Sequence, residues 1–258
     1  MTPNSIRLEE LSWSDVQEAV QNGHKTVVIG VGSTEQHGPH LPLAVDAILA
    51  ENMALKLAEK MGNALVAPTI RTGCSAHHLD FAGTVSLREE TLTMIIEDYI
   101  DSLVRHGFEN IVIVSGHGGN IFAIRTAMNN MRMKHPRKKI VQARLGRYAP
   151  KERFSKIPGT NVTSGEHGGY LTNSQVMSVR PDLVHLEKGT IEWGPWPDDI
   201  EEFEKILKEK GMKAFTKTGT LGDGTKGDPN FGREYFETIT TEAAKEIQKM
   251  LELYPRWV

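Results

Sequence analysis

The sequence predicts an α/β fold in which a mostly parallel sheet is covered by helices on both faces. Two observations support this prediction. Short apolar runs rich in β-branched residues alternate along the chain with longer segments of helical periodicity. These runs are apolar throughout rather than at every second position, which is typical of strands buried on both faces. No linker-like stretch or internal repeat divides the chain, so we expect residues 1–258 to form a single domain.

The N-terminal elements follow from local signals. Ser14 is expected to begin a helix, with Gln17 completing a capping box and Gly23 ending the helix after residue 21. The run at 26–30 is continuously apolar or β-branched and predicts the first buried strand. Residues 44–61 show helical spacing of apolar side chains, and a glycine follows as the expected C-terminal stop.

The same alternation continues beyond residue 63. The expected elements, in chain order, are a short strand at 64–67, an amphipathic helix over 87–106, a β-branched strand at 111–114, a helix over 121–134 and a strand at 140–143. The final third is less regular, and only 198–210 and 240–253 show a helical pattern. Because ligands of such sheets bind at the carboxyl ends of the strands, functional residues are expected after residues 30, 67 and 114.

Composition excludes several classes of function. The 258 residues include 30 Lys+Arg and 33 Asp+Glu, and the net charge of −3 gives no electrostatic reason to bind nucleic acid. No segment approaches the ~20 apolar residues that cross a bilayer. Residues 1–10 lack the pattern of a signal peptide, and Cys74 is the single cysteine, so no internal disulfide is possible. We therefore expect a cytoplasmic protein that acts on a small molecule and does not contact membranes.

The segment after the first predicted strand reads GVGSTEQHGPHLPLAVD, residues 30–46. Its start imitates a dinucleotide-binding fingerprint, but Glu35 replaces the third glycine and would place a carboxylate where a pyrophosphate must approach. Glu35 and His37 point to the same side of an extended segment, and Asp46 at the next helix start can reach them. Such ligands suit Zn²⁺ or Mn²⁺. The alternative is that Asp46 only balances a helix N-terminus and His37 only bonds within the loop.

Two further clusters combine glycine with histidine. SGHGGN follows the strand at 111–114 and presents His117, while GEHGG at 165–169 presents Glu166 and His167. Glycines let the backbone turn sharply around these side chains. Three such clusters in one chain favour a metal site over unrelated turns.

These motifs together resemble the creatininase (creatinine amidohydrolase) family. The resemblance rests on GSTEQHGPHLPLAVD, CSAHHLDFAGTVSL at 74–87, SGHGGN, GEHGG followed by RPDLV at 180–184, and GDGTKGDP at 222–229. It implies a three-layer α/β/α sandwich, a hydrolytic site with two divalent ions (Zn²⁺ and/or Mn²⁺) and a homo-oligomer, commonly a hexamer. Two such ions would polarise a carbonyl and lower the pKa of a bridging water.

The resemblance also implies roles for individual residues. Glu35 and His117 would bind one metal, Asp46 would bridge both, and His37 would bind the second. Creatininase proper completes the second site with a carboxylate where this chain has Gly119, so Glu166 is taken as its substitute. His167 is the expected proton donor, and His78, Gly83 and Thr84 are expected to contact substrate. His77 is expected to face elsewhere. Trp193 and Trp196 are expected to line either the pocket or a subunit contact.

The expected function is therefore metal-dependent hydrolysis of a cyclic or small amide, of the creatinine amidohydrolase type. Relatives of this kind include formamide deformylases, a peptide-cleaving maturation enzyme and a hydrolase that opens a diketo-inositol ring at a carbon–carbon bond, and these remain alternatives. A metal-dependent reaction without net hydrolysis is a further one. A non-catalytic oligomeric binding protein is the alternative from another class, although all expected ligand types are present.

Overall fold

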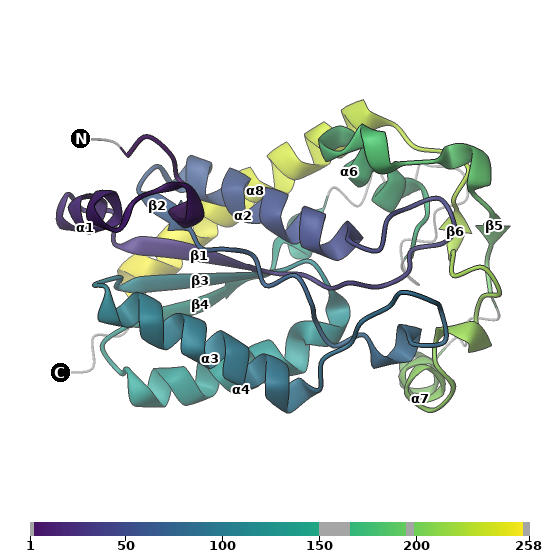
Figure 1. The fold of residues 1–258 in the computed structure, drawn as a ribbon, viewed down its shortest axis with the longest axis horizontal. Coiled ribbons are helices and arrows are strands. Elements are labelled where there is room, and N and C mark those ends of the chain that lie inside the picture. Colours follow the sequence, from purple (N-terminus) through teal and green to yellow (C-terminus); the bar gives the residue numbers. More distant parts are fainter. Residues whose placement is uncertain (1–2, 150–165, 195–198, 255–258) are drawn as a thin grey trace.

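The computed structural model describes residues 3–149, 166–194 and 199–254. A four-stranded sheet forms its centre, with the order β2-β1-β3-β4 and all neighbouring pairs parallel (Figure 1). The strands are β1 (Thr26–Val31), β2 (Ala64–Val66), β3 (Asn110–Ser115) and β4 (Lys139–Ala143). In this register Val27 lies opposite Leu65 on one side and Ile111 on the other. The predicted parallel sheet is confirmed.

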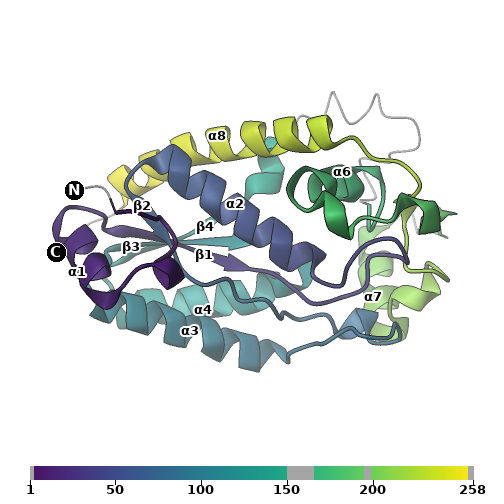
Figure 2. The ribbon, with the colours of Figure 1, turned by 45° about the horizontal axis from the view of Figure 1, so that its top comes forward.

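Helices cover both faces of the sheet, as predicted. Figure 2 shows one layer formed by α2 and α8 with α6 beside them, and a second layer formed by α3 and α4. The bounds are α1 (Trp13–Gln21), α2 (Val45–Met61), α3 (Glu89–Arg105), α4 (Ile121–Lys134), α6 (Tyr170–Val179), α7 (Ile200–Lys210) and α8 (Pro229–Leu253). The result is the three-layer α/β/α arrangement that the family resemblance implied.

Side-chain alternation along the strands divides the core in two. Val28 and Val112 pack with the α2 and α8 layer, which includes the buried Phe236. Their neighbours Ile29 and Ile111 point the other way and pack with the α3 and α4 layer. Every position of β1 is buried, which explains why its sequence after Thr26 is apolar without alternation.

Three details of the sequence prediction were wrong. Ser12, not Ser14, caps α1: its hydroxyl accepts from the Asp15 N–H, and the Asp15 carboxylate accepts from the Ser12 N–H. The last helix begins at Pro229 rather than near residue 240, because Asp228 caps it and proline fits a first helical turn. Helix α6 was not predicted, since its sequence lacks an amphipathic pattern and buries polar residues.

Smaller elements gather beyond the carboxyl ends of the strands (Figure 1). An antiparallel pair, β5 (Ile191–Glu192) and β6 (Gly222–Asp223), lies there beside α6 and α7. Short 3-10 helices occur at Leu8–Glu10, Ala76–His78, Gly118–Asn120, Leu145–Tyr148, Pro181–Leu183, Leu186–Lys188 and Met212–Ala214. Two of them, Ala76–His78 and Gly118–Asn120, come after β2 and β3 and carry residues at the candidate site.

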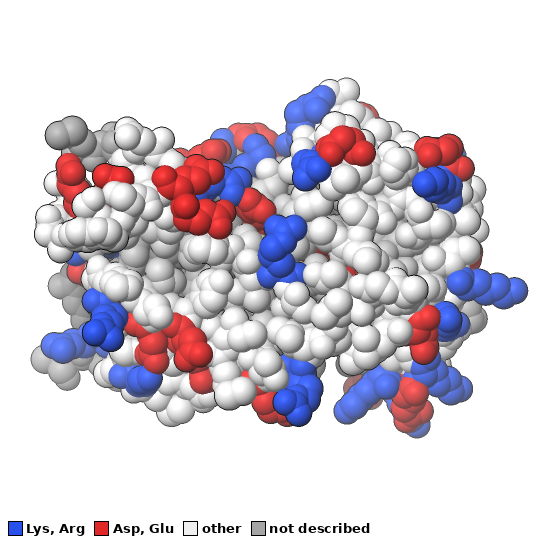
Figure 3. Space-filling model, in the orientation of Figure 1, with Lys and Arg blue, Asp and Glu red and all other residues white. Residues whose placement is uncertain are grey.

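The surface carries charges of both signs. Acidic and basic side chains are interspersed on the face drawn in Figure 3, with uncharged surface between them. Within the described ranges, no helix combines the length and the apolar character that a membrane span requires.

Candidate metal centre

The candidate site lies where three chain segments meet at the carboxyl ends of β1 and β3. The loop after β1 supplies Glu35 and His37, and the second residue of α2 is Asp46. The loop after β3 supplies His117. All four side chains are buried, with relative exposures of 1–8%. Parallel strands therefore bring together residues that are far apart in the sequence, as the prediction required.

Glu35, Asp46 and His117 form one compact group. His117 Nδ1 lies 3.3 Å from a Glu35 oxygen and 3.1 Å from Asp46 Oδ2. One ligand atom from each of the three residues lies within 4.8 Å of the others. Two carboxylates and one imidazole at this spacing are a donor set for Zn²⁺ or Mn²⁺.

His37 lies on the other side of Asp46. Its Nε2 is 3.2 Å from Asp46 Oδ1, whereas His117 faces the second oxygen, Oδ2. Glu35, His37 and His167 form a second group whose ligand atoms lie within 4.8 Å of one another. The ring of His167 is stacked on that of His37, with centroids 4.0 Å apart. Asp46 thus has one histidine at each carboxylate oxygen.

The outward ring nitrogens of these histidines face backbone carbonyl oxygens. His117 Nε2 lies 3.0 Å from the Cys74 oxygen, and His37 Nδ1 lies 3.3 Å from the Glu35 oxygen. A carbonyl only accepts, so each of these nitrogens carries a proton and donates it. The other nitrogen of each ring faces the carboxylates, where it holds a proton or, once that proton is lost, offers its lone pair to a metal ion.

The surroundings of one buried carboxylate oxygen give a second indication. Asp46 Oδ2 is buried and makes no regular hydrogen bond; His117 Nδ1, 3.1 Å away, can neutralise it only while that nitrogen carries a proton. Such an atom is costly unless something else satisfies it. A cation between Asp46 and the two histidines would do so, and the residues present therefore fit a metal ion.

The carboxylates and histidines of the site shift one another's pKa values. Burial alone would raise the pKa of Glu35, but His117 and the other nearby histidines hold that pKa well below its usual value. Burial likewise would lower the pKa of His117, yet Glu35 and Asp46 raise it well above the ordinary value. A proton on His117 balances the carboxylates, and a divalent ion would take its place.

His167 and His78 line the same space. The His167 Nε2 is 2.6 Å from the Gln36 carbonyl oxygen and must donate to it; the 3.1 Å contact of Nε2 with the Gln36 amide nitrogen then joins two donors and is no hydrogen bond. Burial lowers the pKa of His167 to about 3 and that of His78 to about 2. His78 Nε2 lies 3.4 Å from a Glu35 oxygen, closer to the ligand group than a substrate-contact role alone implies.

Two residues were missed or misjudged from the sequence. Gln36 is buried, and its amide nitrogen lies 2.8 Å from His78 Nδ1 while its amide oxygen accepts from the Gly38 N–H. The motif signal was present, because Gln36 stands between Glu35 and His37. His77 does not face elsewhere: its ring is parallel to that of His117, with centroids 5.6 Å apart. The 3-10 turn at Ala76–His78 directs both histidines toward the site.

Glu166 precedes His167 in the chain but is in neither group of candidate ligands. One carboxylate oxygen accepts from the Leu171 N–H at the start of α6, and the other is buried without a hydrogen bond. Burial raises the pKa of Glu166 to about 7. Its role as the fifth ligand stays a prediction.

The structure gives a physical reason for Gly119. A Cβ at this position would lie 2.3 Å from the Cys74 carbonyl oxygen and 2.4 Å from His117 Nε2. Those two atoms form the hydrogen bond that orients His117. A carboxylate at residue 119 therefore cannot coexist with this arrangement of the loop.

Polar contacts outside the ligand groups tie the loops together. The buried Asn120 accepts from the Cys74 N–H and donates to the Gly32 carbonyl, both at 2.9 Å. Ser33 donates to Glu35 and is hydrogen-bonded to the buried Ser75. These bonds join the loops after β1, β2 and β3, so they fix the spacing of the ligand-bearing segments.

Of the other predicted site residues, Thr84 lies beside the loop that follows β1. Thr84 accepts a hydrogen bond from the Gln36 N–H, and the neighbouring Gly83 is exposed. Trp193 is 37% exposed, whereas Trp196 lies outside the described residues. Their expected contact with substrate stays a prediction.

The chain matches the family model described as "Creatininase: Creatinine amidohydrolase" over residues 9–247. It is 30% identical over 240 residues to the mycofactocin precursor peptide peptidase of Mycobacterium tuberculosis, covering 88% of this chain and 86% of the relative. It is also 30% identical over 198 residues to the creatinine amidohydrolase of Pseudomonas putida, covering 71% and 75%.

Solved structures that are similar to this chain are also named as creatininases. A structure named as creatininase with Mn has a TM-score of 0.85 and 26% identity, covering 98% of this chain and all of that chain. A creatininase variant described as Zn-Zn type has a TM-score of 0.81 and 26% identity, again over 98% of this chain.

Proposed function

Since the chain belongs to the creatininase family of metal-dependent amidohydrolases, we propose that its centre holds two divalent ions, Zn²⁺ or Mn²⁺, and hydrolyses a cyclic or other small amide. One observation carries the two-ion assignment. The two oxygens of Asp46 face different histidines, Oδ1 toward His37 and Oδ2 toward His117. A carboxylate so placed is positioned to bridge two ions. Glu35 would join His117 at one ion.

The ligand set has a suitable charge. Glu35 and Asp46 supply two negative charges, and Glu166 would supply a third. Three carboxylates offset most of the charge of two divalent ions and leave a cationic centre, which favours an anionic nucleophile. When bound, such ions polarise a substrate carbonyl and lower the pKa of water toward neutrality.

His167 is placed to move a proton. Its Nε2–H is held by the Gln36 carbonyl, so Nδ1 is the ring atom that is free to accept and return a proton. The stacked ring of His37 fixes the plane of His167. We propose that Nδ1 takes a proton from the attacking water and gives it to the leaving nitrogen.

The fifth ligand has two candidates. Glu166 is the candidate that the motif favours, while His167 is the residue whose ligand atom lies near Glu35 and His37. If His167 binds the second ion, it cannot move the proton. The two assignments differ in which substitution removes the second metal, and this difference makes them separable.

The second candidate substrate class is a peptide amide. The relatives with this activity share 30% identity over 88% of the chain, a longer match than that to the creatinine amidohydrolase. The relatives also include a 3-dehydro-scyllo-inosose hydrolase, 24% identical over 72% of the chain, and formyl-removing enzymes. The attack on a carbonyl is common to all of them.

The test is a panel assay of the metal-loaded protein. Creatinine, a formamide, a cyclic diketone and a short peptide are assayed side by side, with turnover repeated in ¹⁸O water. We expect hydrolysis of an amide and one solvent oxygen in the product. Turnover of only the diketone would move the assignment to carbon–carbon cleavage, and turnover without solvent oxygen would contradict hydrolysis. Failure of all four substrates would favour a non-catalytic binding protein.

Two properties complete the proposal. By family resemblance we propose a homo-oligomer, with a hexamer as the expected state. From the sequence pattern we propose a cytoplasmic location. Light scattering during size-exclusion chromatography measures the first, and cell fractionation the second. A monomeric mass at micromolar concentration would contradict the oligomer.

A further inference from the structure

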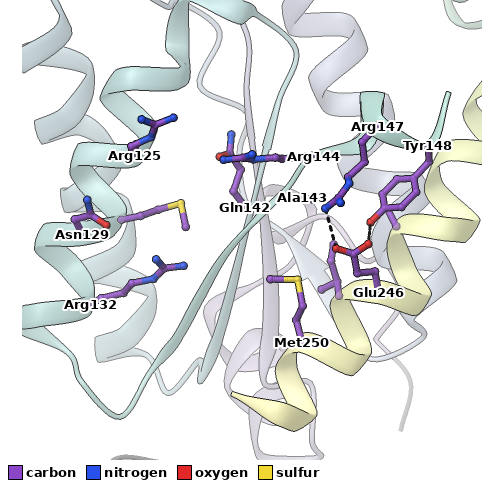
Figure 4. A pocket seen from close by; sticks show the side chains of 13 residues that line it. Arg125, Asn129, Arg132, Gln142, Ala143, Arg144, Arg147, Tyr148, Glu246 and Met250 are labelled. Carbon is purple, nitrogen blue, oxygen red and sulfur yellow. Dashed lines mark hydrogen bonds and ion pairs between the residues drawn. The ribbon is translucent and has the colours of Figure 1, made fainter. Parts of the chain in front are cut away.

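A groove outside the metal centre follows the outer side of β4. The sheet order leaves β4 at an edge, with α4 on one side of that edge and α8 on the other (Figure 4). The groove has a volume of about 300 Å³. Figure 4 shows side chains from α4 on one wall, from the end of β4 in the middle, and from Tyr148 and α8 on the other wall. None of the candidate metal ligands lines it.

Arginines dominate the charge of this groove. Arg125 and Arg132 come from α4, Arg144 follows β4, and Arg147 lies in the next 3-10 turn. Arg147 is paired with Glu246, the acidic residue of the lining, which also accepts from Tyr148. In the part of the chain that the structure describes, the other three arginines have no acidic partner. Among the described residues of a chain of net charge −3, positive charge without an acidic partner is thus concentrated in this groove.

Two of these guanidinium groups are held in place. Arg132 donates through Nε and Nη2 to the Ile140 carbonyl oxygen at 2.9 and 2.6 Å, which fixes its plane and leaves Nη1 for a ligand. Arg125 lies over the ring of Phe122 at 5.8 Å, a contact that uses its face and leaves its N–H edge free. Guanidinium groups fixed in this way bind carboxylate or phosphate oxygens with less loss of side-chain entropy.

The rest of the lining suits a small polar molecule. The amides of Asn129 and Gln142 line the groove, and neither side chain has a hydrogen bond within the described ranges. The buried Met128, Ala143 and Ile247 form an apolar base. A few oriented polar groups over an apolar base are typical of small-molecule sites, and the volume is at the lower end of their range.

Charge and hydrogen bonding argue against other occupants. A second copy related by a two-fold axis through this groove would place arginines against arginines. A peptide strand added to β4 would need the Ile140 carbonyl, which Arg132 already occupies. Both features are compatible with a small anion.

We propose that this groove binds a small organic anion carrying at least two negative oxygen-bearing groups, carboxylate or phosphate. Arg125 and Arg144 bind the oxygens, and Arg132 and Gln142 orient them. The site is separate from the proposed metal centre and does not depend on the assigned hydrolase activity.

The test is calorimetric titration of the metal-loaded protein at low ionic strength with inorganic phosphate and, separately, with succinate. The double variant Arg125→Gln/Arg144→Gln is compared with Arg105→Gln, an exposed arginine on α3 outside the groove. We expect the double variant to weaken anion binding about tenfold or more and the control to bind as wild type. The probe that binds with the higher affinity identifies the natural group as phosphate or carboxylate.

Three results would overturn the proposal. Unchanged affinity in the double variant would place the anion at the metal ions or elsewhere. No binding of either probe at millimolar concentration would mean that the groove takes no small anion. A double variant that changes the oligomer mass by light scattering, with anion affinity unchanged, would assign the groove to a subunit contact.

Discussion

The amide nitrogen of Gln36 lies 2.8 Å from Nδ1 of His78. An amide N–H donates, so Nδ1 accepts and the proton of the neutral His78 ring sits on Nε2. That nitrogen lies 3.4 Å from a Glu35 oxygen. Gln36 thereby sets the tautomer of a histidine that faces a candidate metal ligand, while its backbone carbonyl holds His167.

Gln36→Ala should lower kcat more than it changes KM. The substitution frees the His78 ring but leaves every proposed ligand in place, so the metal content should stay the same. Loss of a partner of this kind costs about 10–100-fold in activity. Steady-state kinetics with metal analysis on the same sample checks this. Gln21→Ala, an exposed glutamine at the end of α1, is the control. Full activity in Gln36→Ala would contradict the positioning role.

His117→Ala should remove bound metal while the fold and oligomer are retained. His117 contacts both Glu35 and Asp46, and its loss leaves these two carboxylates without the imidazole between them. Metal content by plasma mass spectrometry, with circular dichroism and light scattering, measures the result. His106→Ala, an exposed histidine after α3, should keep its metal. Wild-type metal content in His117→Ala would show that our ligand assignment is wrong.

Asn120→Ala should destabilise the protein through the loops rather than through the ligands. It leaves the Cys74 N–H and the Gly32 carbonyl without their buried partner. We expect the free energy of unfolding to fall by about 1–3 kcal/mol. Metal affinity should fall as well, since the ligand-bearing loops lose their connection. Denaturant unfolding measures the first effect; Asn130→Ala, an exposed site bonded to Glu97, should change stability by less than about 0.5 kcal/mol.

A pH-dependent effect is expected at Asp101, far from the metal centre. Its hydrogen bonds with Lys134 and His135 lower the pKa of Asp101. A carboxylate whose folded-state pKa is lowered stabilises the protein above its ordinary pKa, and this contribution disappears as the pH falls through the folded-state value. Asp101→Asn should therefore cost about 0.5 kcal/mol at pH 7, since the pair is partly exposed. The difference from wild type should shrink below about pH 4.

Urea unfolding of both proteins at several pH values between 7 and 3 checks this prediction. High salt at pH 7 should also reduce the difference, because solvent ions screen an exposed pair. A difference that stays constant down to pH 3 would show that the carboxylate charge is not its cause.

The sequence predicted the central sheet and the ligand-bearing loops because both depend on local signals. Continuous apolar runs such as Val27–Val31 identify buried strands, and the carboxyl ends of parallel strands meet at one edge. The position of His77 was not predictable in this way. Its direction depends on a single 3-10 turn, in which a small change of backbone angle moves a ring toward or away from the site.

Helix α6 shows a second limit of local signals. Thr172, Asn173 and Ser174 are buried polar residues, and the side chains of Asn173 and Ser174 hydrogen-bond to segments outside the helix. Asn173, for example, contacts His40 and the backbone of Gly224 and Lys226. A helix held by such tertiary contacts has no amphipathic pattern to detect.

The most direct test of the central claim is the metal content per chain. The protein is purified without chelator or affinity nickel, loaded with Zn²⁺ or Mn²⁺, and compared with Glu166→Gln and His167→Asn by plasma mass spectrometry. We predict about two ions per wild-type chain and about one in Glu166→Gln, with His167→Asn retaining two. Loss of the second ion from His167→Asn alone would make His167 the fifth ligand. At most one ion in the loaded wild-type protein would contradict the two-metal centre.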